Sequence, residues 1–376
     1  TFHSGSMETE EVEEQNNVGS PSPLFERARL FSENKNHSKQ PITPICNGKS
    51  WEVQFGDKHS QFQVTIHNAR EFRELRSNVL PRGDASFIKS LARCHNWNAC
   101  GGKSGSFFLR TRDERFVIKE FSNTELKTFL AKANRYFKYM AETLKKKRPT
   151  VLARILGVYR VECKNLLTGC SSKSDVLVME NLFHNQPNIK HIYDLKGSRR
   201  KRFVSEQQAP SQTDLTELAN DALNMQNVAE DEVVELLNDS PRMQVLLDQN
   251  FANSMLDSPI FMRASVKSEL NAVLTADTDF LVSLLIMDYS LLVGVDQKNC
   301  TLVIGIIDYV REFTMDKKVE MIFKQTIAGT SQDQPTVVTP RLYRDRFLSR
   351  LNDYFTVVSD HWSHSHLESF KEEQNT

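Results

Sequence analysis

The sequence predicts an α+β fold of two lobes, in which antiparallel sheets pack against helices. Residues 107–119 have the pattern of a strand, a charged turn and a second strand. Residues 124–146 carry apolar side chains at helical spacing, which predicts one long amphipathic helix. Residues 176–179 form an apolar strand that runs into polar, extended sequence, as expected where two lobes are joined. Strands thus precede and follow a long helix, which is typical of this fold class.

Composition divides the chain into ordered and flexible parts. Residues 1–50 are acidic at first and then rich in Ser, Pro and Asn, a composition that cannot build a core. Residues 205–240 contain nine acidic residues and no Lys or Arg, which indicates a flexible acidic insertion. We therefore expect an N-terminal lobe at 51–182, a C-terminal lobe at 183–362 that contains this insertion, and a tail at 363–376.

Charge and cysteine content narrow the class of partner and the compartment. The 48 basic residues balance 48 acidic ones, so no overall field attracts nucleic acid, and attraction to acidic lipid must be local. The six cysteines lack Cys-x-x-Cys spacing, which favours a reducing compartment such as the cytoplasm. The sequence shows no charged-then-apolar leader and no run of about 18 apolar residues, so we expect any membrane contact to be peripheral.

A glycine-rich loop at residues 101–106 precedes the strand–turn–strand unit. It contains Gly-Lys-Ser but does not fit a Walker A loop, because Trp97 stands where the first glycine is needed and a strand follows. It fits the glycine-rich hairpin of kinases, whose backbone N–H groups and following lysine contact the phosphates of ATP. A surface hairpin with a solvated lysine is the alternative. The residues expected to bind ATP phosphates are Gly102, Lys103, Ser104, Gly105 and Lys119.

The strand at 176–179 predicts the hinge that would bind adenine through backbone groups. The expected hinge residues are Met179, Glu180, Asn181 and Leu182. In kinases the long helix after the lysine strand offers a glutamate to that lysine, and Glu125 is the candidate here. An ordinary acidic residue in the first turn of a helix is the alternative for Glu125.

Two aspartates are candidates for phosphoryl transfer, which needs carboxylates to hold Mg²⁺ and to orient the attacking hydroxyl. Asp288 follows a helical run, and Asp308 ends an apolar strand at 302–307. A turn at 296–299 lies between them, so both can lie at the open end of one hairpin. The tripeptides His-Arg-Asp and Asp-Phe-Gly are absent from the sequence, which disfavours an ordinary protein kinase.

Five motifs, taken in order, resemble the phosphatidylinositol phosphate kinases over residues 53–362. They are Gly-Gly-Lys-Ser-Gly-Ser at 101–106, Val-Ile-Lys at 117–119, Asp-Leu-Lys-Gly-Ser at 194–198, Met-Asp-Tyr-Ser-Leu-Leu at 287–292 and Ile-Ile-Asp at 306–308. Residues 155–160, 178–183 and 335–338 are similar to the type III members, the phosphatidylinositol 3-phosphate 5-kinases. The resemblance implies the two-lobed fold of that family.

The resemblance also implies roles for single residues. Lys119 would hold ATP phosphate, Asp194 and Lys196 would line the catalytic cleft, Asp288 would be the catalytic-loop acid, and Asp308 would bind Mg²⁺. The segment at 313–340 is similar to the family's specificity loop, which implies that Lys317 and Lys318 face the lipid headgroup; a plain surface helix is the alternative. Arg199 and Arg200, within the basic run at 199–202, are further candidates for contact with anionic lipid.

The function implied by the resemblance is transfer of phosphate from ATP, with Mg²⁺, to the 5-hydroxyl of phosphatidylinositol 3-phosphate in a membrane. It implies a peripheral protein at the cytosolic face of endosomal membranes, and it allows regulatory protein partners. A kinase of another phosphatidylinositol monophosphate, a kinase of soluble inositol phosphates or proteins, and a phosphoinositide-binding scaffold with vestigial catalysis are the alternatives. The intact polar positions argue against a scaffold, and Lys317 with Lys318 argues against a soluble substrate.

Overall fold

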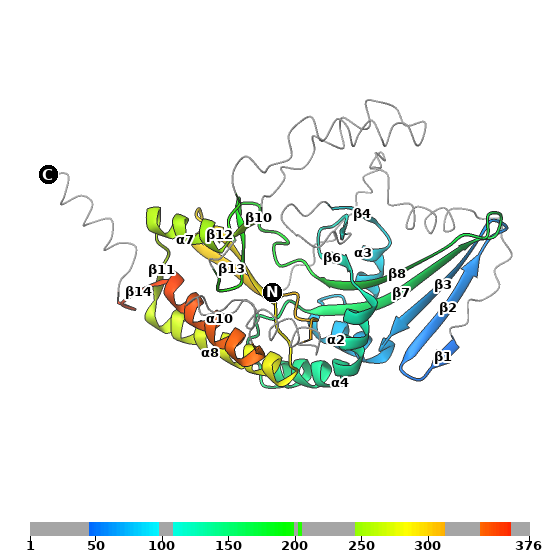
Figure 1. Cartoon of the computed structure of the whole chain (residues 1–376), viewed down its shortest axis with the longest axis horizontal. Helices are drawn as coiled ribbons and strands as arrows, with labels where there is room; N and C mark the ends of the chain where they lie inside the picture. The colour runs from blue at the N-terminus through cyan, green and yellow to red at the C-terminus, as the bar shows by residue number, and fades with distance from the viewer. Residues whose placement is uncertain (1–44, 98–107, 199–201, 205–244, 313–338, 362–376) are drawn as a thin grey trace, which may run out of the picture.

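A large antiparallel sheet and a smaller mixed sheet organise the two lobes (Figure 1). The computed structural model describes residues 45–97, 108–198, 202–204, 245–312 and 339–361. The predicted glycine loop, the acidic insertion at 205–240 and the tail at 363–376 lie outside the described residues. Strand β1 begins at Ile45, so folded structure starts before the predicted boundary at 51.

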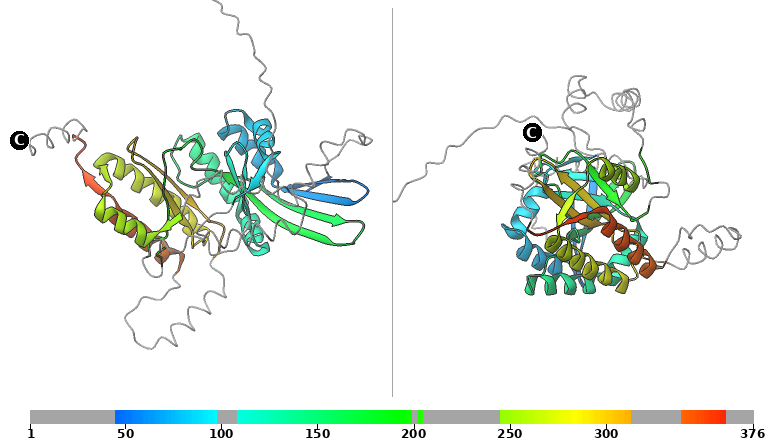
Figure 2. Two further views of the ribbon diagram at one scale, coloured as in Figure 1. Left: turned by 90° about the horizontal axis from the view of Figure 1, so that it is seen from above. Right: turned by 90° about the vertical axis from the view of Figure 1, so that its left-hand side faces the viewer.

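The N-terminal lobe is built on an eight-stranded sheet in the order β1-β2-β3-β7-β8-β6-β5-β4, with antiparallel neighbours throughout. The hairpin predicted at 107–119 is confirmed as β5 and β6, with Phe108 opposite Lys119. In Figures 1 and 2 the β2–β3 and β7–β8 hairpins extend beyond the helices of this lobe. The strands are β1 Ile45–Asn47, β2 Ser50–Gly56, β3 Ser60–His67, β4 Cys94–Asn96, β5 Phe108–Thr111, β6 Phe116–Glu120, β7 Ile155–Asn165 and β8 Ser171–Glu180.

In the described part of this lobe, the sheet is accompanied by helices α2 Ala69–Val79, α3 Gly83–Leu91 and α4 Asn123–Lys145. Helix α4 confirms the predicted long helix, and its start is fixed by a capping box between Ser122 and Glu125. The buried face of α4 recurs every three or four residues: Leu126, Phe129, Ala133 and Met140 follow the predicted apolar pattern, and Tyr136 is buried with them. Each large apolar side chain buried in this way contributes roughly 1.5–3 kcal/mol.

The C-terminal lobe contains a four-stranded sheet in the order β10-β9-β12-β13. Strands β9 (Ile192–Leu195) and β10 (Val245–Leu247) are parallel, whereas β12 (Ser290–Asp296) is antiparallel to both β9 and β13 (Thr301–Ile307). The helices of this lobe are α7 Asp248–Asp257, α8 Ala264–Ser283 and α10 Pro340–Tyr354. The short strands β11 (Phe261–Arg263) and β14 (Thr356–Val358) form a separate parallel pair. The predicted α+β class is therefore confirmed.

The two faces of this smaller sheet have different neighbours. Leu195, Leu291 and Ile306 are fully buried and belong to one core cluster with residues of α8 and α10. On the opposite face, the linker after β8 lies so close that a Cβ on Gly294 would meet Phe183, and one on Gly305 would meet Leu182. One face therefore makes the core, and the other faces the linker between the lobes.

Candidate active site

Lys119 and Asp308 meet where the two lobes come together. Lys119 lies on β6 of the N-terminal lobe, and Asp308 directly follows β13 of the C-terminal lobe. The Lys119 Nζ atom is 2.5 Å from Asp308 Oδ1. The lysine side chain is 15% exposed, whereas the aspartate is 40% exposed and retains access to solvent. The two residues for which the sequence predicts phosphate and metal binding are thus brought together from positions 189 apart.

Asp288 and Asp308 lie at the same end of one hairpin, as the sequence predicts. Asp288 lies two positions before the start of β12, Asp308 directly follows β13, and Ser290 pairs with Ile307. Both aspartates adopt the left-handed backbone conformation, with φ of 64° and 61°. This conformation costs a residue other than glycine roughly 1–3 kcal/mol and tends to persist at functional sites. The left-handed backbone conformation therefore sets the direction of both carboxylates, and the sequence pattern does not reveal it.

Strand β9 supplies the second wall of the site. Asp194 pairs with Leu292, so the alternation of side chains places it on the face opposite the buried Leu195, toward the interlobe linker. Lys196 follows on the same side, and its Nζ donates to the backbone carbonyl of Asp288 at 2.9 Å. The predicted catalytic residues Asp194, Lys196 and Asp288 are thus neighbours.

Arg202 does not belong to the lipid-contacting basic run that the sequence suggests at 199–202. Its guanidinium lies 2.6 Å from Asp194 Oδ1 and also pairs with Asp248. Although burial disfavours its charge, these two carboxylates raise the pKa of Arg202. Arg199 and Arg200 lie outside the described residues. Arg202 therefore has a structural role beside Asp194, because it pairs with that nearby carboxylate and with Asp248, which lies 46 residues further along the chain.

Asp248 is a functional neighbour that the sequence interpretation missed. It is fully buried at the start of α7 and accepts bonds from the backbone N–H groups of Lys196 (3.1 Å) and Ser198 (3.2 Å). The Tyr354 hydroxyl donates to it at 3.2 Å. The signal that selects Asp308, an acid at the end of an apolar strand, applies equally to Asp248 after β10. Asp248 fixes the backbone of the Asp-Leu-Lys-Gly-Ser motif.

Gly197 is required by the same motif for two reasons. Its φ is +67°, and a Cβ at this position would lie 2.9 Å from the Cα of Phe347 in α10. Any side chain would therefore strain the backbone and push the motif away from α10.

The residues predicted to form the hinge lie at the end of β8 and just after it, and the backbone N–H groups of two of them are already engaged. The backbone N–H of Glu180 donates to Arg154 O (3.1 Å), and that of Asn181 donates to Arg115 O (2.9 Å). Burial raises the pKa of the Glu180 carboxyl, which also pairs with Arg154. Met179 lines the pocket beside Lys119, and Leu182 lies against Gly305 of β13.

Shortly after Asp308, Arg311 and Glu312 form ion pairs with residues of helix α4. Glu125 bonds the backbone N–H of Ser122 and pairs with Arg311 at 3.4 Å, so it serves as a capping acid rather than a partner of Lys119. Lys132 pairs with Glu312 at 2.7 Å. The segment that follows, with Lys317 and Lys318, lies outside the described residues.

The cleft at Lys119 and Asp308 suits a phosphate with a hard cation. Mg²⁺ prefers oxygen ligands and is usually held by one or two carboxylates together with substrate phosphates. Within the described ranges, no group of three or more His, Cys, Asp or Glu residues could form a metal site by itself. A metal shared between Asp308 and a phosphate fits this arrangement. The pocket here is lined by Lys119, Phe121, Ile155, Leu177, Met179, Asp308, Tyr309 and Val310.

Comparison with known proteins agrees with this geometry. The family model described as Phosphatidylinositol-4-phosphate 5-Kinase matches residues 94–301 and 296–354. The chain belongs to this family. The match includes both lysines and all three aspartates of the described site, and it confirms the predicted resemblance to phosphatidylinositol phosphate kinases.

Curated relatives agree with the finer resemblance to the type III members. The human protein named 1-phosphatidylinositol 3-phosphate 5-kinase is 40% identical over 326 residues, covering 86% of this chain and 14% of the relative. The Arabidopsis thaliana protein 1-phosphatidylinositol-3-phosphate 5-kinase FAB1A is 40% identical over 305 residues, which cover 81% of this chain and 15% of the relative. The Saccharomyces cerevisiae protein 1-phosphatidylinositol 3-phosphate 5-kinase FAB1 is 41% identical over 281 residues, which cover 74% of this chain and 11% of the relative. The chain thus spans only 11% to 15% of the length of these relatives.

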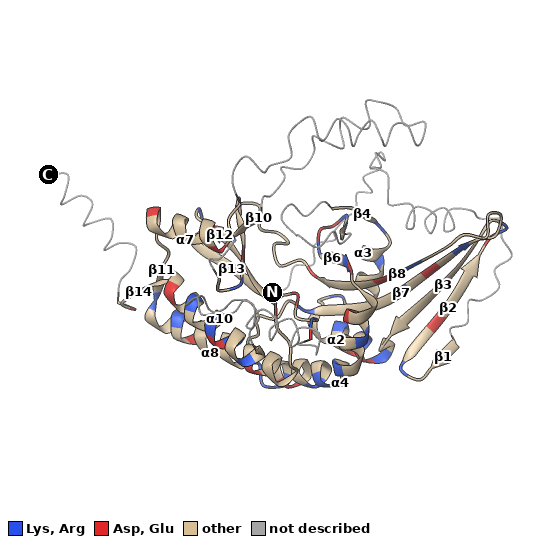
Figure 3. Cartoon of the chain, viewed as in Figure 1, with Lys and Arg blue, Asp and Glu red and all other residues tan. Residues whose placement is uncertain are grey.

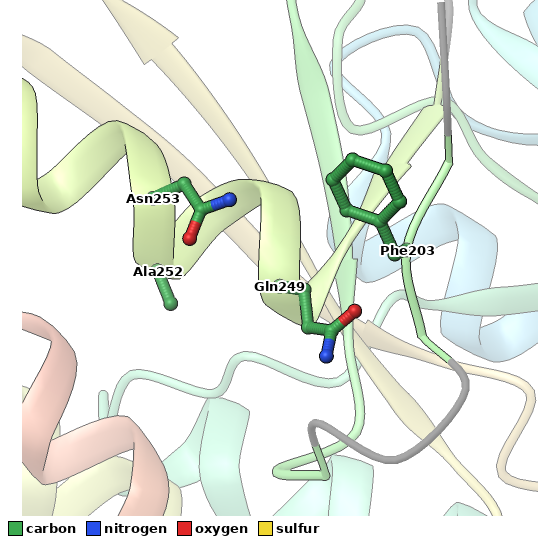
Figure 4. A pocket seen from close by; sticks show the side chains of 4 residues that line it. All are labelled: Phe203, Gln249, Ala252 and Asn253. Atoms are coloured by element: carbon green, nitrogen blue, oxygen red, sulfur yellow. The ribbon is translucent and has the colours of Figure 1, made fainter.

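A second hollow shares no lining residue with the pocket at Lys119 and Asp308. Phe203, Gln249, Ala252 and Asn253 line it, the last three on α7 (Figure 4). No titratable side chain is among these residues, so this hollow offers no group for phosphoryl transfer.

Proposed function

We propose that this chain transfers the γ-phosphate of ATP to the 5-hydroxyl of phosphatidylinositol 3-phosphate and so forms phosphatidylinositol 3,5-bisphosphate. The observation that carries the proposal is the contact of Lys119 with Asp308 across the cleft, next to Lys196 and Asp288. Family membership supports lipid kinase chemistry, and the names of the relatives at about 40% identity support this lipid and this hydroxyl.

The residues of the cleft account for the chemistry. Lys119 and Lys196 place positive charge where the triphosphate would lie, and low exposure strengthens these interactions. Asp308 would hold Mg²⁺, which would neutralise charge on the phosphates. Asp288 accepts the proton of the inositol hydroxyl while the hydroxyl oxygen forms a bond to the γ-phosphorus. The bond between the γ-phosphorus and the oxygen that bridges it to the β-phosphate breaks, and ADP leaves.

We also propose that the reaction takes place on a bilayer, at the cytosolic face of endosomal membranes. The lipid substrate requires such a surface, and Lys317, Lys318, Arg199 and Arg200 would each add about 1 kcal/mol of attraction to anionic lipid. Helix α8 carries a single basic residue, the buried Lys267, whereas the arginines of α10 are interspersed with Asp345 and Asp353 (Figure 3). Among the described residues, no helix has the length and hydropathy needed to cross a bilayer.

Regulatory protein partners are part of the same proposal. Strand β1 forms one edge of the large sheet, and Ile45 on it is 60% exposed. A strand at the edge of a sheet is a place where a partner chain can add a further strand.

The test is an assay with radiolabelled ATP and vesicles that each contain one monophosphorylated inositide, followed by positional analysis of the product. We expect the highest turnover with phosphatidylinositol 3-phosphate and new phosphate at the 5-position. Faster turnover on another monophosphate, or on a water-soluble headgroup, would favour one of the alternative kinases. Binding of the lipid without turnover would favour the scaffold.

A further inference from the structure

Residues 150–153, here called the bracket, connect the C-terminal end of α4 to strand β7 and lie against β13. The backbone N–H of Ile306 donates to Val151 O at 2.6 Å, and the N–H of Ala153 donates to Ile306 O at 2.9 Å. Leu152 and Ile306 form a parallel β-bridge. The bracket therefore extends the C-terminal sheet past β13, while the same chain enters the N-terminal sheet at Ile155.

The bracket holds the backbone on both sides of Asp308. Ile306, two residues before it, exchanges the two bonds just described. Tyr309, the next residue, is buried and donates its hydroxyl to the backbone carbonyl of Ala153. Asp308 lies between these anchors with its left-handed backbone. The direction of its carboxylate, and hence its contact with Lys119, depends on where the bracket lies.

A single buried carboxylate fixes the bracket to the rest of the C-terminal lobe. Asp277 on α8 has no exposed surface. Its Oδ2 accepts bonds from the Val151 N–H (2.7 Å) and the Thr150 hydroxyl (2.9 Å), whereas its Oδ1 accepts the Tyr139 hydroxyl (2.5 Å). One oxygen thus serves the bracket and the other serves helix α4.

The cost of burying Asp277 indicates that its role is more than packing. Placing a carboxylate in the interior costs several kcal/mol unless hydrogen bonds satisfy it, and a well-packed apolar residue is often no less stable. All three donors here are neutral, and two of them belong to the bracket. Apolar packing between α4 and α8 already exists, since Tyr139 and Phe280 stack at 4.0 Å. What the carboxylate adds is a fixed position for the backbone at 150 and 151.

We propose that Asp277 is a positioning residue for the nucleotide site: it holds Thr150 and Val151, and the bracket in turn holds Asp308 in place against Lys119. This inference rests on the proposed function, because it takes Asp308 as the carboxylate that serves the nucleotide. The hydrogen-bonded path from Asp277 toward Asp308 runs through Val151 and Ile306.

The experiment compares two test variants with two matched controls in the full chain. Asp277→Asn and Thr150→Val disturb the bonds to the bracket with little change in shape. Asp279→Asn removes the same charge two positions along α8, at a side chain that is 61% exposed and paired with Arg344. Tyr139→Phe removes only the donor to the other oxygen of Asp277 and keeps the stacked ring.

The readout is the affinity for a fluorescent ATP analogue with and without Mg²⁺, in the absence of lipid, together with the melting temperature. Substitution of a residue that orients a metal ligand commonly lowers metal affinity or activity by about 10- to 100-fold. We expect the Mg²⁺-dependent part of the affinity to fall about tenfold in Asp277→Asn and several-fold in Thr150→Val. Both controls should match the wild type, although Tyr139→Phe melts at a lower temperature.

Several outcomes would overturn the proposal. One is unchanged Mg²⁺-dependent affinity in Thr150→Val, a variant mild enough to fold if Asp277→Asn does not. Another is an equal loss in Tyr139→Phe, which would show that Asp277 only stabilises the fold. Because this assay needs no lipid, a wild type that binds nucleotide without phosphorylating phosphatidylinositol 3-phosphate would contradict the proposed function alone. A wild type without Mg²⁺-dependent binding would contradict both.

Discussion

The two sides of the catalytic cleft are held in different ways. On the β9 side, Asp248 lies behind Lys196 and is paired with the cation Arg202, all within the C-terminal lobe. On the β13 side, Asp308 is held by Lys119 from the other lobe and by the bracket, which rests on Asp277 and its neutral donors. The β9 side is therefore formed within one lobe, whereas the β13 side depends on how the two lobes meet.

Asp248→Asn should give the largest effect, because it breaks the charged support of the β9 side. Removing one partner of a buried ion pair costs roughly 3–5 kcal/mol, since Arg202 then lacks part of its compensation. We expect a loss of unfolding free energy of this size in urea, and a fall in kcat of tenfold or more. Asp257→Asn, at the exposed C-terminal end of the same helix, is the control. If Asp248→Asn kept the wild-type kcat, Asp248 would not be needed to hold the β9 side of the cleft.

Gly197→Ala tests whether the β9 side needs its contact with α10. Strain at the positive φ and the close Cα of Phe347 should together lower the unfolding free energy by more than about 1 kcal/mol and reduce kcat. Gly169→Ala is the matched control: its φ is +71°, but nothing lies within 4 Å of the added Cβ. The difference between the two melting temperatures reports the contact alone. Equal losses would mean that α10 does not support the motif.

A pair of tyrosine variants separates the two sides more finely. Tyr309→Phe leaves the buried carbonyl of Ala153 without its donor, which costs about 1–3 kcal/mol, and should weaken Mg²⁺-dependent nucleotide binding several-fold. Tyr354→Phe removes a hydroxyl from Asp248, which keeps its bonds from Lys196, Ser198 and Arg202. Nucleotide binding should therefore be normal in Tyr354→Phe. If a nucleotide titration showed weaker binding in Tyr354→Phe than in Tyr309→Phe, the two sides of the cleft would not differ as described.

The smallest effect concerns pH and lies outside the cleft. Burial, and then the charge of Arg160, lower the pKa of His67 at the end of β3. The unfolded chain takes up the proton first as pH falls below about 6.5, so the folded state loses stability there. His67→Asn should flatten the dependence of unfolding free energy on pH between 7.5 and 5. Its nucleotide affinity should follow the wild type at each pH, because His67 belongs to neither side.

Local patterns predicted the elements that carry the chemistry. The capped helix α4, the hairpin of β5 and β6, and the aspartates at one end of β12 and β13 all follow from periodicity and strand ends. Arg202 was misjudged because a basic run looks solvated in sequence, whereas its carboxylate partners lie up to 46 residues away. Asp277 gave no signal at all, since its bonds to Thr150 and Val151 span more than 120 positions. Contacts made only by tertiary packing leave no trace in local sequence.

The central claim is tested most directly by the wild type and Asp308→Asn, assayed side by side on vesicles containing phosphatidylinositol 3-phosphate. Asp308→Asn keeps the shape of the side chain but removes the charge that faces Lys119. The account predicts that the wild type forms product phosphorylated at the 5-position, and that kcat of Asp308→Asn falls at least about a hundredfold with an unchanged melting curve. Product without phosphate at the 5-position, or an Asp308→Asn variant that still phosphorylates the lipid, would contradict it.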